Sequence, residues 1–210
     1  SMIKIKTLNN FLTDIDYKEL VSLELKAVNE NEMCVNQNRI YKNGDTKLEC
    51  LSETCIKKLF TNYYDKGIKI LSELYPEKVD LVEYCKFDII ETGKNYEFTI
   101  HDDQPETLLS GVIYLAPEKN SGTIFYDTKS GENKTEMEWA QNKGVFFSRK
   151  ERNSWHSFKG DGKNNRLVLV FNLMTTDIKS VCKIEGVNYL YSQFRNFLNP
   201  YFYKFFKFTI

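Results

Sequence analysis

Apolar and polar residues alternate in a series of short runs between residues 81 and 173. A period of two is typical of strands with one buried face, and turn signals at residues 93–95 (Gly-Lys-Asn) and 131–133 (Gly-Glu-Asn) separate several of the runs. The pattern therefore predicts an antiparallel sandwich or barrel of about eight short strands. The expected strands are residues 81–90, 96–103, 108–115, 123–127, 136–140, 144–148 and 166–173.

The region before residue 79 has helical spacing instead. Apolar residues from Cys55 to Leu74 fall largely on one helical face, Ser52 is a suitable N-cap, and Pro76 is expected to end the helix. A shorter helix is expected within residues 16–28, and residues 3–6 alternate like an edge strand. The long amphipathic helix is predicted to support the sheet by packing on one of its faces.

Length and composition fit a single domain that is mainly β with N-terminal helices. The 210 residues are enough for one sizeable core. We expect a helical and mixed support region at residues 1–78, the sheet core at 79–175 and an aromatic C-terminal extension at 176–210. With 29 basic and 29 acidic residues the net charge is zero, so no nucleic-acid partner is indicated.

Cysteine content and hydropathy indicate a cytoplasmic protein. The five cysteines are odd in number and form no C-x-x-C pair, so we expect reduced thiols in a reducing compartment rather than a disulfide framework or a zinc site. No long apolar run opens the sequence and none reaches 18 residues, so neither a secretory leader nor a membrane-spanning helix is expected.

The C-terminal residues 189–210 are unusually rich in phenylalanine and tyrosine. Such a segment could form a homodimer contact or lie on a membrane surface. The interpretation favoured by the pattern is that it docks against the helical side of the sheet. A second, basic stretch at residues 148–152 (Ser-Arg-Lys-Glu-Arg) is interpreted as a solvated hairpin tip, with the border of an active-site mouth as the alternative.

The two histidines of the chain provide its strongest chemical signal. His101 and Asp103 are two positions apart in an expected strand, so their side chains should point the same way, and His156 follows after several more strands. Two imidazoles and one carboxylate form the facial triad of non-haem Fe(II) enzymes, which leaves three metal positions open. The alternative is a buried structural His101 with Asp103 starting a turn.

Arg166 opens an otherwise apolar strand ten positions after His156. A buried arginine is costly unless it meets an anion, so it is either in a structural salt bridge or binds the distal carboxylate of 2-oxoglutarate. A planar guanidinium can bind such a carboxylate through two hydrogen bonds. Tyr114 could add its hydroxyl to the same carboxylate, although a strand tyrosine is more often only packed.

In their order along the chain, these segments resemble the core of the 2-oxoglutarate/Fe(II)-dependent oxygenases. The likeness is greatest to the prolyl-4-hydroxylase-type branch and its bacterial and phage relatives, and it covers about 80 residues. It rests on His101-Asp102-Asp103, residues 110–115 (SGVIYL), 121–126 (SGTIFY), 146–148 (FFS), 153–157 (NSWHS) and 165–172 (NRLVLVFN). Many relatives have a small hydroxyl residue two positions after the arginine, where this chain has Val168.

The resemblance implies a double-stranded β-helix (jelly-roll, cupin-like) core and an Fe(II) site formed by His101, Asp103 and His156. It implies 2-oxoglutarate as cosubstrate on Arg166, with Tyr114 as a second contact, and ascorbate as a reductant. The expected reaction hydroxylates a C–H bond of a small molecule or peptide, such as a prolyl or other amino-acid side chain. Two alternatives stay open: a cupin-type dioxygenase without 2-oxoglutarate, and a non-catalytic barrel that binds a metal or ligand.

Overall fold

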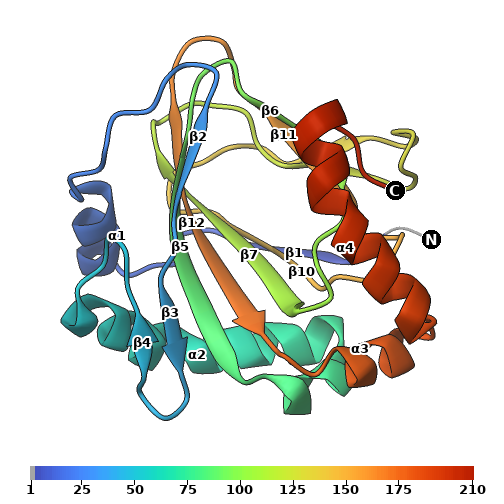
Figure 1. Cartoon of the computed structure of the whole chain (residues 1–210). Coiled ribbons are helices and arrows are strands. Elements are labelled where there is room, and N and C mark those ends of the chain that lie inside the picture. The colour runs from blue at the N-terminus through green and yellow to red at the C-terminus, as the bar shows by residue number, and fades with distance from the viewer. Residues whose placement is uncertain (1–2) are drawn as a thin grey trace.

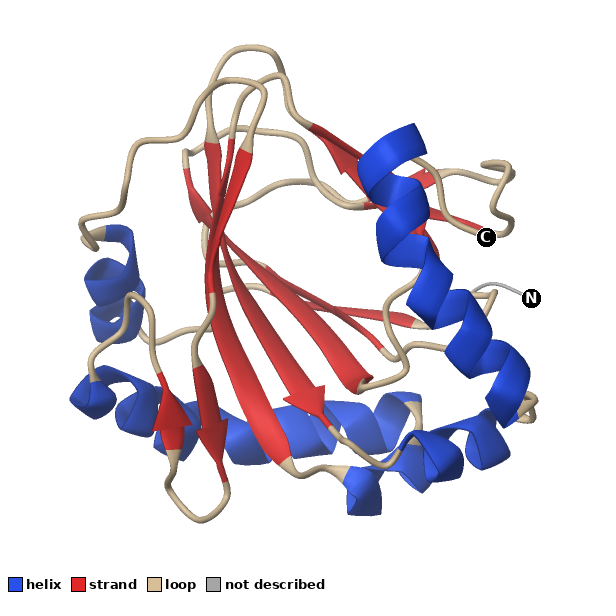
Figure 2. Cartoon of the chain, viewed as in Figure 1, coloured by secondary structure: helices blue, strands red, loops and turns tan. Residues whose placement is uncertain are grey.

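Two antiparallel sheets form the centre of the molecule. The computed structural model describes residues 3–210. The larger sheet has the order β1-β10-β7-β12-β5-β3-β4, with β2 also paired to β5, and the smaller sheet has the order β6-β11-β8-β9 (Figures 1 and 2). The larger sheet comprises β1 (Ile5–Leu8), β2 (Met33–Asn36), β3 (Arg39–Tyr41), β4 (Thr46–Lys47), β5 (Tyr84–Thr92), β7 (Thr107–Ala116), β10 (Gly144–Phe147) and β12 (Arg166–Met174). The smaller comprises β6 (Glu97–His101), β8 (Ile124–Tyr126), β9 (Thr135–Glu136) and β11 (Trp155–Lys159).

From β5 to β12 the chain passes back and forth between the two sheets, with β8 and β9 together in the smaller one, in the manner of the double-stranded β-helix that the resemblance implies. The alternation along β12 shows why the chain folds this way. Leu169, Phe171 and Leu173 belong to the hydrophobic core on one face of the larger sheet. Arg166 and Asn172 point from the other face into a cavity between the sheets. One strand thus supplies both the core and the lining of the cavity.

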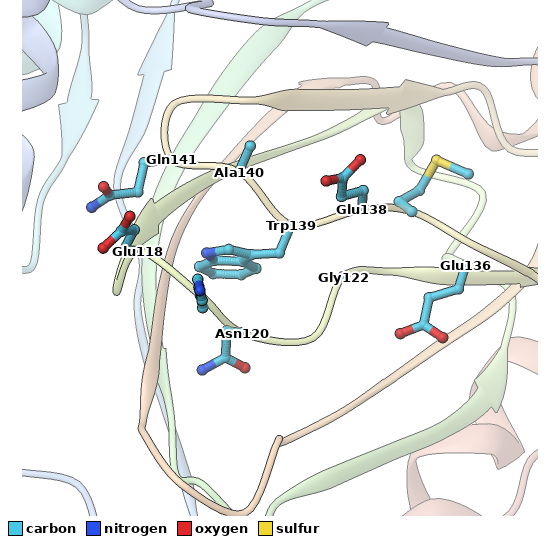
Figure 3. Close-up of a pocket in the computed structure, with 10 residues that line it drawn as sticks. Glu118, Asn120, Gly122, Glu136, Glu138, Trp139, Ala140 and Gln141 are labelled. Carbon is cyan, nitrogen blue, oxygen red and sulfur yellow. The ribbon is translucent and has the colours of Figure 1, made fainter.

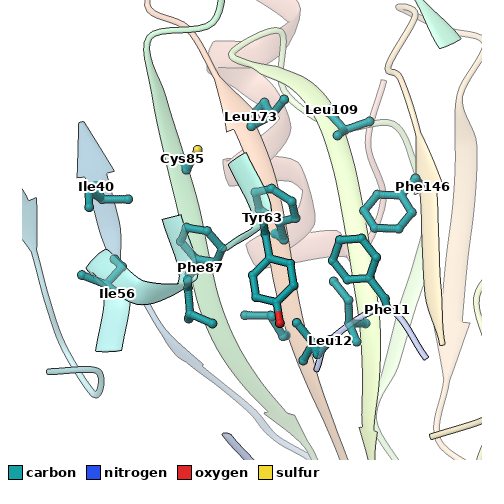
Figure 4. Close-up of a cluster of buried hydrophobic side chains, with 14 of the residues drawn as sticks. Phe11, Leu12, Ile40, Ile56, Tyr63, Cys85, Phe87, Leu109, Phe146 and Leu173 are labelled. Atoms are coloured by element: carbon teal, nitrogen blue, oxygen red, sulfur yellow. The ribbon is translucent and has the colours of Figure 1, made fainter. Parts of the chain in front are cut away.

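The support helix α2 (Glu53–Leu74) covers the outer face of the larger sheet. Ser52 caps it by accepting the backbone N–H of Cys55 at 3.0 Å. Tyr63 projects from α2 among side chains of the sheet, including Phe87 (Figure 4). Gly67 lies so close to Phe171 that a Cβ atom would come within 2.8 Å of its ring. The absence of a side chain at Gly67 therefore allows α2 to pack directly on the Phe171 ring of β12.

The shorter elements differ in part from the sequence-based expectations. Helix α1 (Asp14–Val21) ends well before residue 28, and a 3-10 helix, η1 (Pro76–Leu81), follows α2. Strands β2 and β3 are not among the expected strands, and β9 is shorter than residues 136–140. β11, which carries His156, was not among the expected strands. Among residues 3–210, no helix has the length and apolar character needed to span a bilayer.

The aromatic C-terminal segment forms two helices, α3 (Ile178–Glu185) and α4 (Tyr189–Phe206). Docking on the helical side of the sheet, the favoured interpretation from sequence, is wrong. Tyr203 of α4 stacks on Phe98 of β6 with 5.0 Å between ring centroids, and its hydroxyl is 3.2 Å from that of Tyr96. α4 therefore lies against the smaller sheet, whereas α2 lies along the larger one (Figure 1).

Candidate metal centre and anion site

The smaller sheet brings the three predicted metal ligands together. β6 and β11 are antiparallel neighbours, and His101 lies directly opposite His156 in their register. Asp103 follows two residues after His101, just beyond the end of β6. The ring centroids of the two histidines are 4.3 Å apart, and one ligand atom from each of the three residues lies within 4.8 Å of the others. No other group of this kind occurs among residues 3–210.

Hydrogen bonds orient both imidazole rings. His101 Nδ1 lies 2.7 Å from the carbonyl of Thr99, and His156 Nδ1 lies 2.8 Å from that of Ser154. A carbonyl can only accept, so each Nδ1 carries the proton and each Nε2 is left free to bind a metal. The Nε2 atoms lie 3.9 Å (His101) and 3.4 Å (His156) from the same oxygen of Asp103. This donor set fits Fe(II), for which two imidazoles and one carboxylate are characteristic.

Without a metal, the three groups perturb one another electrostatically. Burial, with the nearby charge of His156, lowers the pKa of His101 to about 4. Burial also opposes a charge on His156, but the carboxylate of Asp103 outweighs it and raises the pKa of His156. Burial would raise the pKa of Asp103, yet the two imidazoles and the Ser110 hydroxyl hold it far below its usual range. An anionic carboxylate and a neutral His101 are the ligand forms that a metal requires.

A buried network of charges supports the loop that carries Asp103. Asp102 points away from the metal ligands and accepts hydrogen bonds from Arg195 Nη2 at 2.6 Å and from the backbone N–H of Arg152 at 2.8 Å. Arg149 Nε donates to the carbonyl of Asp103 at 2.7 Å. Buried charges of this kind need partners, and here three cations face three anions. The network consists of Lys78, Arg149 and Arg195 with Asp102, Glu151 and Glu185.

The prediction that residues 148–152 form a solvated hairpin tip holds for the exposed Lys150 and Arg152 but is wrong for Arg149 and Glu151. Arg149 is fully buried and Glu151 is 6% exposed. Arg149 Nη1 donates to Glu185 at 3.1 Å, and Arg195 Nη1 donates to Glu151 at 3.1 Å. The sequence pattern does not reveal this burial, because the ion-pair partners of Arg149 and Glu151 come from α3 and α4, more than 30 residues further along the chain.

Arg166 has no anionic partner in the described part of the chain. It is 3% exposed, no carboxylate oxygen of residues 3–210 lies within 4.0 Å of it, and its Nε atom has no hydrogen-bond partner. Aromatic rings surround it: its Cζ atom is 4.4 Å from the Phe158 ring and 5.4 Å from that of Trp139. Burial lowers the pKa of Arg166 to about 10, so it is still charged at neutral pH. The salt bridge considered as an alternative is absent.

Arg166 and the metal ligands line one cavity of about 350 Å³ between the two sheets. Phe98, Phe147 and Phe158 contribute apolar surface, which limits access of water. A larger surface pocket of about 810 Å³ lies elsewhere and is lined by Glu118, Glu136, Glu138 and Trp139 among others (Figure 3). It has no histidine or cysteine in its lining. The cavity between the sheets is therefore the candidate site.

Structural comparisons identify the type of fold. Three matching structures are a prolyl-4-hydroxylase from Pseudomonas putida, a 2OG-Fe(II) oxygenase family member from Burkholderia pseudomallei, and a prolyl hydroxylase from Trichoplax adhaerens in complex with a hypoxia inducible factor peptide fragment. The fold is that of the 2OG-Fe(II) oxygenases.

The likeness to these oxygenases is one of fold and not of close sequence. For the Pseudomonas protein the identity is 13% and the TM-score 0.55, with 82% of this chain and 93% of that chain covered. The values are 14%, 0.57, 81% and 84% for the Burkholderia protein, and 15%, 0.53, 84% and 86% for the Trichoplax protein. No family model matches the sequence, and no curated protein does.

Tyr114 lies beside the oxygenase-like cavity but is tied to a neighbour. Its hydroxyl donates to Thr123 Oγ1 at 2.9 Å and accepts the Thr123 backbone N–H at 2.8 Å, and its ring stacks on Trp139. Thr123 itself lines the cavity. Sequence reasoning named Tyr114 and missed Thr123, Trp139 and Phe158, because an aromatic or threonine side chain in a strand is usually only packed.

Proposed function

We propose that this protein is an Fe(II)- and 2-oxoglutarate-dependent oxygenase. The observation that carries the proposal is one cavity that holds both a two-histidine, one-carboxylate cluster and a buried guanidinium with no carboxylate partner among residues 3–210. A cupin-type enzyme without 2-oxoglutarate needs the cluster of metal ligands but does not need the buried guanidinium. A buried positive charge without a partner is costly unless a ligand supplies the anion, and 2-oxoglutarate has a free carboxylate at its far end.

Each residue has a role in this proposal that follows from its position. His101, Asp103 and His156 would hold the iron, which when bound supplies the activation of dioxygen. Arg166 would bind the distal carboxylate of 2-oxoglutarate. Tyr114 donates its proton to Thr123 Oγ1, so the Thr123 hydroxyl proton is free to be donated to the same carboxylate. Phe158 and Trp139 would exclude water from this contact.

The proposed reaction is hydroxylation of a C–H bond coupled to decarboxylation of 2-oxoglutarate. One oxygen atom of O₂ enters the substrate and the other enters succinate, with release of carbon dioxide. We propose a small molecule or a peptide as substrate, with a prolyl or other amino-acid side chain as the first class to test. The peptide bound to the Trichoplax prolyl hydroxylase supports this choice. Ascorbate is proposed as the reductant that keeps the iron in its Fe(II) state.

Anaerobic titration of the Fe(II)-loaded protein with 2-oxoglutarate tests the proposal without a known substrate. We expect a weak visible charge-transfer band that saturates. In Arg166→Met, loss of a charge-assisted contact should weaken 2-oxoglutarate binding roughly 10–100-fold while Fe(II) binding is kept. Arg166→Lys should retain part of the affinity. An Arg166→Ala variant with full oxygenase activity and no succinate formation would favour the cupin alternative.

A further inference from the structure

Helix α4 has its polar face inside and its aromatic face outside. Its buried residues are Ser192, Arg195 and Asn199. Seven of its large apolar residues are at least half exposed: Leu190 75%, Tyr191 50%, Phe194 60%, Phe197 66%, Tyr201 53%, Phe205 67% and Phe206 66%. A surface helix of a globular protein has the opposite arrangement. The exposed face is therefore an unusual concentration of apolar surface.

The contacts of the inner face explain why the helix does not turn this surface inward. Arg195 donates to Asp102 and Glu151, and Ser192 Oγ donates to Glu151 at 3.1 Å. Asn199 Oδ1 accepts the backbone N–H of Ile210 at 2.7 Å. Rotating α4 would leave Asp102 and Glu151 buried without Arg195, which costs several kcal/mol for each unpaired charge. The ion network thus fixes the orientation of α4.

Most of the exposed residues lie on one stripe with the spacing of a helix-pairing seam. Leu190, Phe194, Phe197 and Tyr201 are separated by four, three and four residues, which is the 3-4 alternation of helices that pack along each other. No aspartate or glutamate occurs in residues 186–210. Lys204 and Lys207 come after Tyr201. The stripe is thus uncharged over about three helical turns.

The stripe is large enough to hold two chains together. Phe205, four residues after Tyr201, continues the stripe. A fully buried large aromatic residue covers about 150–250 Å², so the five residues of the stripe at these exposures offer roughly 500–800 Å². A standard stable interface buries about 800 Å² on each partner. Aromatic side chains that meet across such a contact add about 0.5–1.5 kcal/mol for each pair. Standard interfaces range from about 600 to 1,000 Å² on each partner, so the area of one stripe reaches the lower part of what a dimer needs from each chain.

We propose that a second copy of this chain covers the aromatic face of α4 and that the protein is a homodimer through paired α4 helices. The stripe supplies the same apolar seam to both partners, as a two-fold interface requires. Figure 1 places α4 at the edge of the molecule, so its outer face is open to a partner. In this dimer the inner face of α4 binds the ion network of its own chain, and its outer face binds the α4 helix of the partner.

Oligomeric state measured by light scattering on a sizing column tests the proposal. At about 10 µM the wild type should have twice the chain mass of 24.7 kDa. The double variant Phe194→Glu/Phe197→Glu should be monomeric, because dimerisation would bury four like charges. The matched control is Ile15→Glu on α1, an equally exposed apolar residue at 76% that lies outside the stripe. It should remain dimeric.

Far-UV circular dichroism and the anaerobic 2-oxoglutarate titration show whether each variant is folded. A monomeric wild type up to about 100 µM, or a dimer that persists in the folded double variant, overturns the proposal. The proposal is also overturned if the wild type is a monomer that sediments with phosphatidylserine-containing vesicles and the double variant does not sediment with them. The aromatic face of α4 would then bind lipid. A failed 2-oxoglutarate titration with an intact dimer would count against the proposed function and not against the interface.

Discussion

At the scale of single residues, Arg166 and Arg149 are two buried arginines with opposite surroundings. Arg149 is fully buried and donates to the carboxylate of Glu185 and to the carbonyl of Asp103. Arg166 is buried to nearly the same degree, but no carboxylate of residues 3–210 lies within 4.0 Å of it and the rings of Phe158 and Trp139 lie close to its guanidinium. The free-energy cost of removing the guanidinium from water is similar for the two residues. Only for Arg149 is this cost offset by an anionic partner among the described residues. This contrast is the basis for assigning an external anion to Arg166.

The contrast predicts opposite effects of the same substitution on stability. In metal-free protein without 2-oxoglutarate, phosphate or sulfate, Arg166→Met should raise the free energy of unfolding by about 1–4 kcal/mol, because an uncompensated buried charge is removed. Arg149→Met should lower it by about 3–5 kcal/mol, because it leaves Glu185 without its full set of cations. Urea unfolding of the two variants measures both. Equal losses would mean that Arg166 has an internal partner.

The three candidate metal ligands were predicted from sequence and lie together in the structure, but the geometry that joins them differs in detail from the expected one. His101 and Asp103 were expected to share the face of one strand. In the structure β6 ends at His101, Asp103 lies in the following loop, and His156 comes from the neighbouring strand. The aromatic surroundings of Arg166 could not be predicted, because Trp139 and Phe158 come from segments brought near it only by the sheet topology.

At the scale of elements, α4 connects the C-terminal segment to the metal centre. Arg195 on α4 holds Asp102, which is flanked by His101 and Asp103. Residues behind metal ligands fix the orientation of those ligands, and their loss typically costs 10–100-fold in metal affinity. α4 is thus part of the support of the candidate site through the contact of Arg195 with Asp102.

Arg195→Met should therefore weaken binding of Fe(II), or of Mn(II) as a stable substitute, by roughly 10–100-fold. The reason is that Asp102 loses its guanidinium partner and the loop to Asp103 loses its anchor. Isothermal titration with Mn(II) measures the effect. The control Asn199→Ala removes a buried polar contact of the same helix, to Ile210, without touching Asp102. If both variants lose equal affinity, docking of α4 matters and the Asp102 contact does not.

The sequence pattern predicts α2 and β12 well, but it does not reveal α4 or β11. α2 and β12 were found because each has a sharp apolar period and α2 has a clear N-cap. α4 was not recognised as a helix because aromatic residues occur on most of its sides and its buried face is polar. β11 was not recognised because its inward residues are His156 and Phe158, and a histidine does not register as apolar.

At the scale of the whole molecule, stability depends on joining the N-terminal region to the sheet core. Tyr63 of α2 does this through its ring and its hydroxyl. The ring packs in the main core, while the hydroxyl donates to Asp16 Oδ2 at 2.5 Å and accepts the backbone N–H of Thr13 at 2.9 Å. Burial, together with the adjacent carboxylate of Asp16, raises the pKa of Tyr63 to about 12.

This raised pKa predicts a loss of stability in alkaline solution. Above pH 10 the tyrosine of the unfolded chain releases its proton while the folded protein retains it, so the unfolded state binds fewer protons and stability falls as pH rises. The loss should begin near pH 10, continue toward pH 12, and reach order 1 kcal/mol from this group. Cys85, whose pKa burial raises to about 12, acts in the same direction.

Urea unfolding at intervals between pH 8 and 11.5 measures this effect. Tyr63→Phe should be less stable than the wild type at pH 8, because Asp16 and Thr13 each lose a hydrogen bond, but its stability should fall less steeply above pH 10. The difference between the two proteins should therefore narrow as pH rises. Parallel curves would mean that the Tyr63 hydroxyl ionises alike in both states, and the buried link between α1 and α2 would then not control alkaline unfolding.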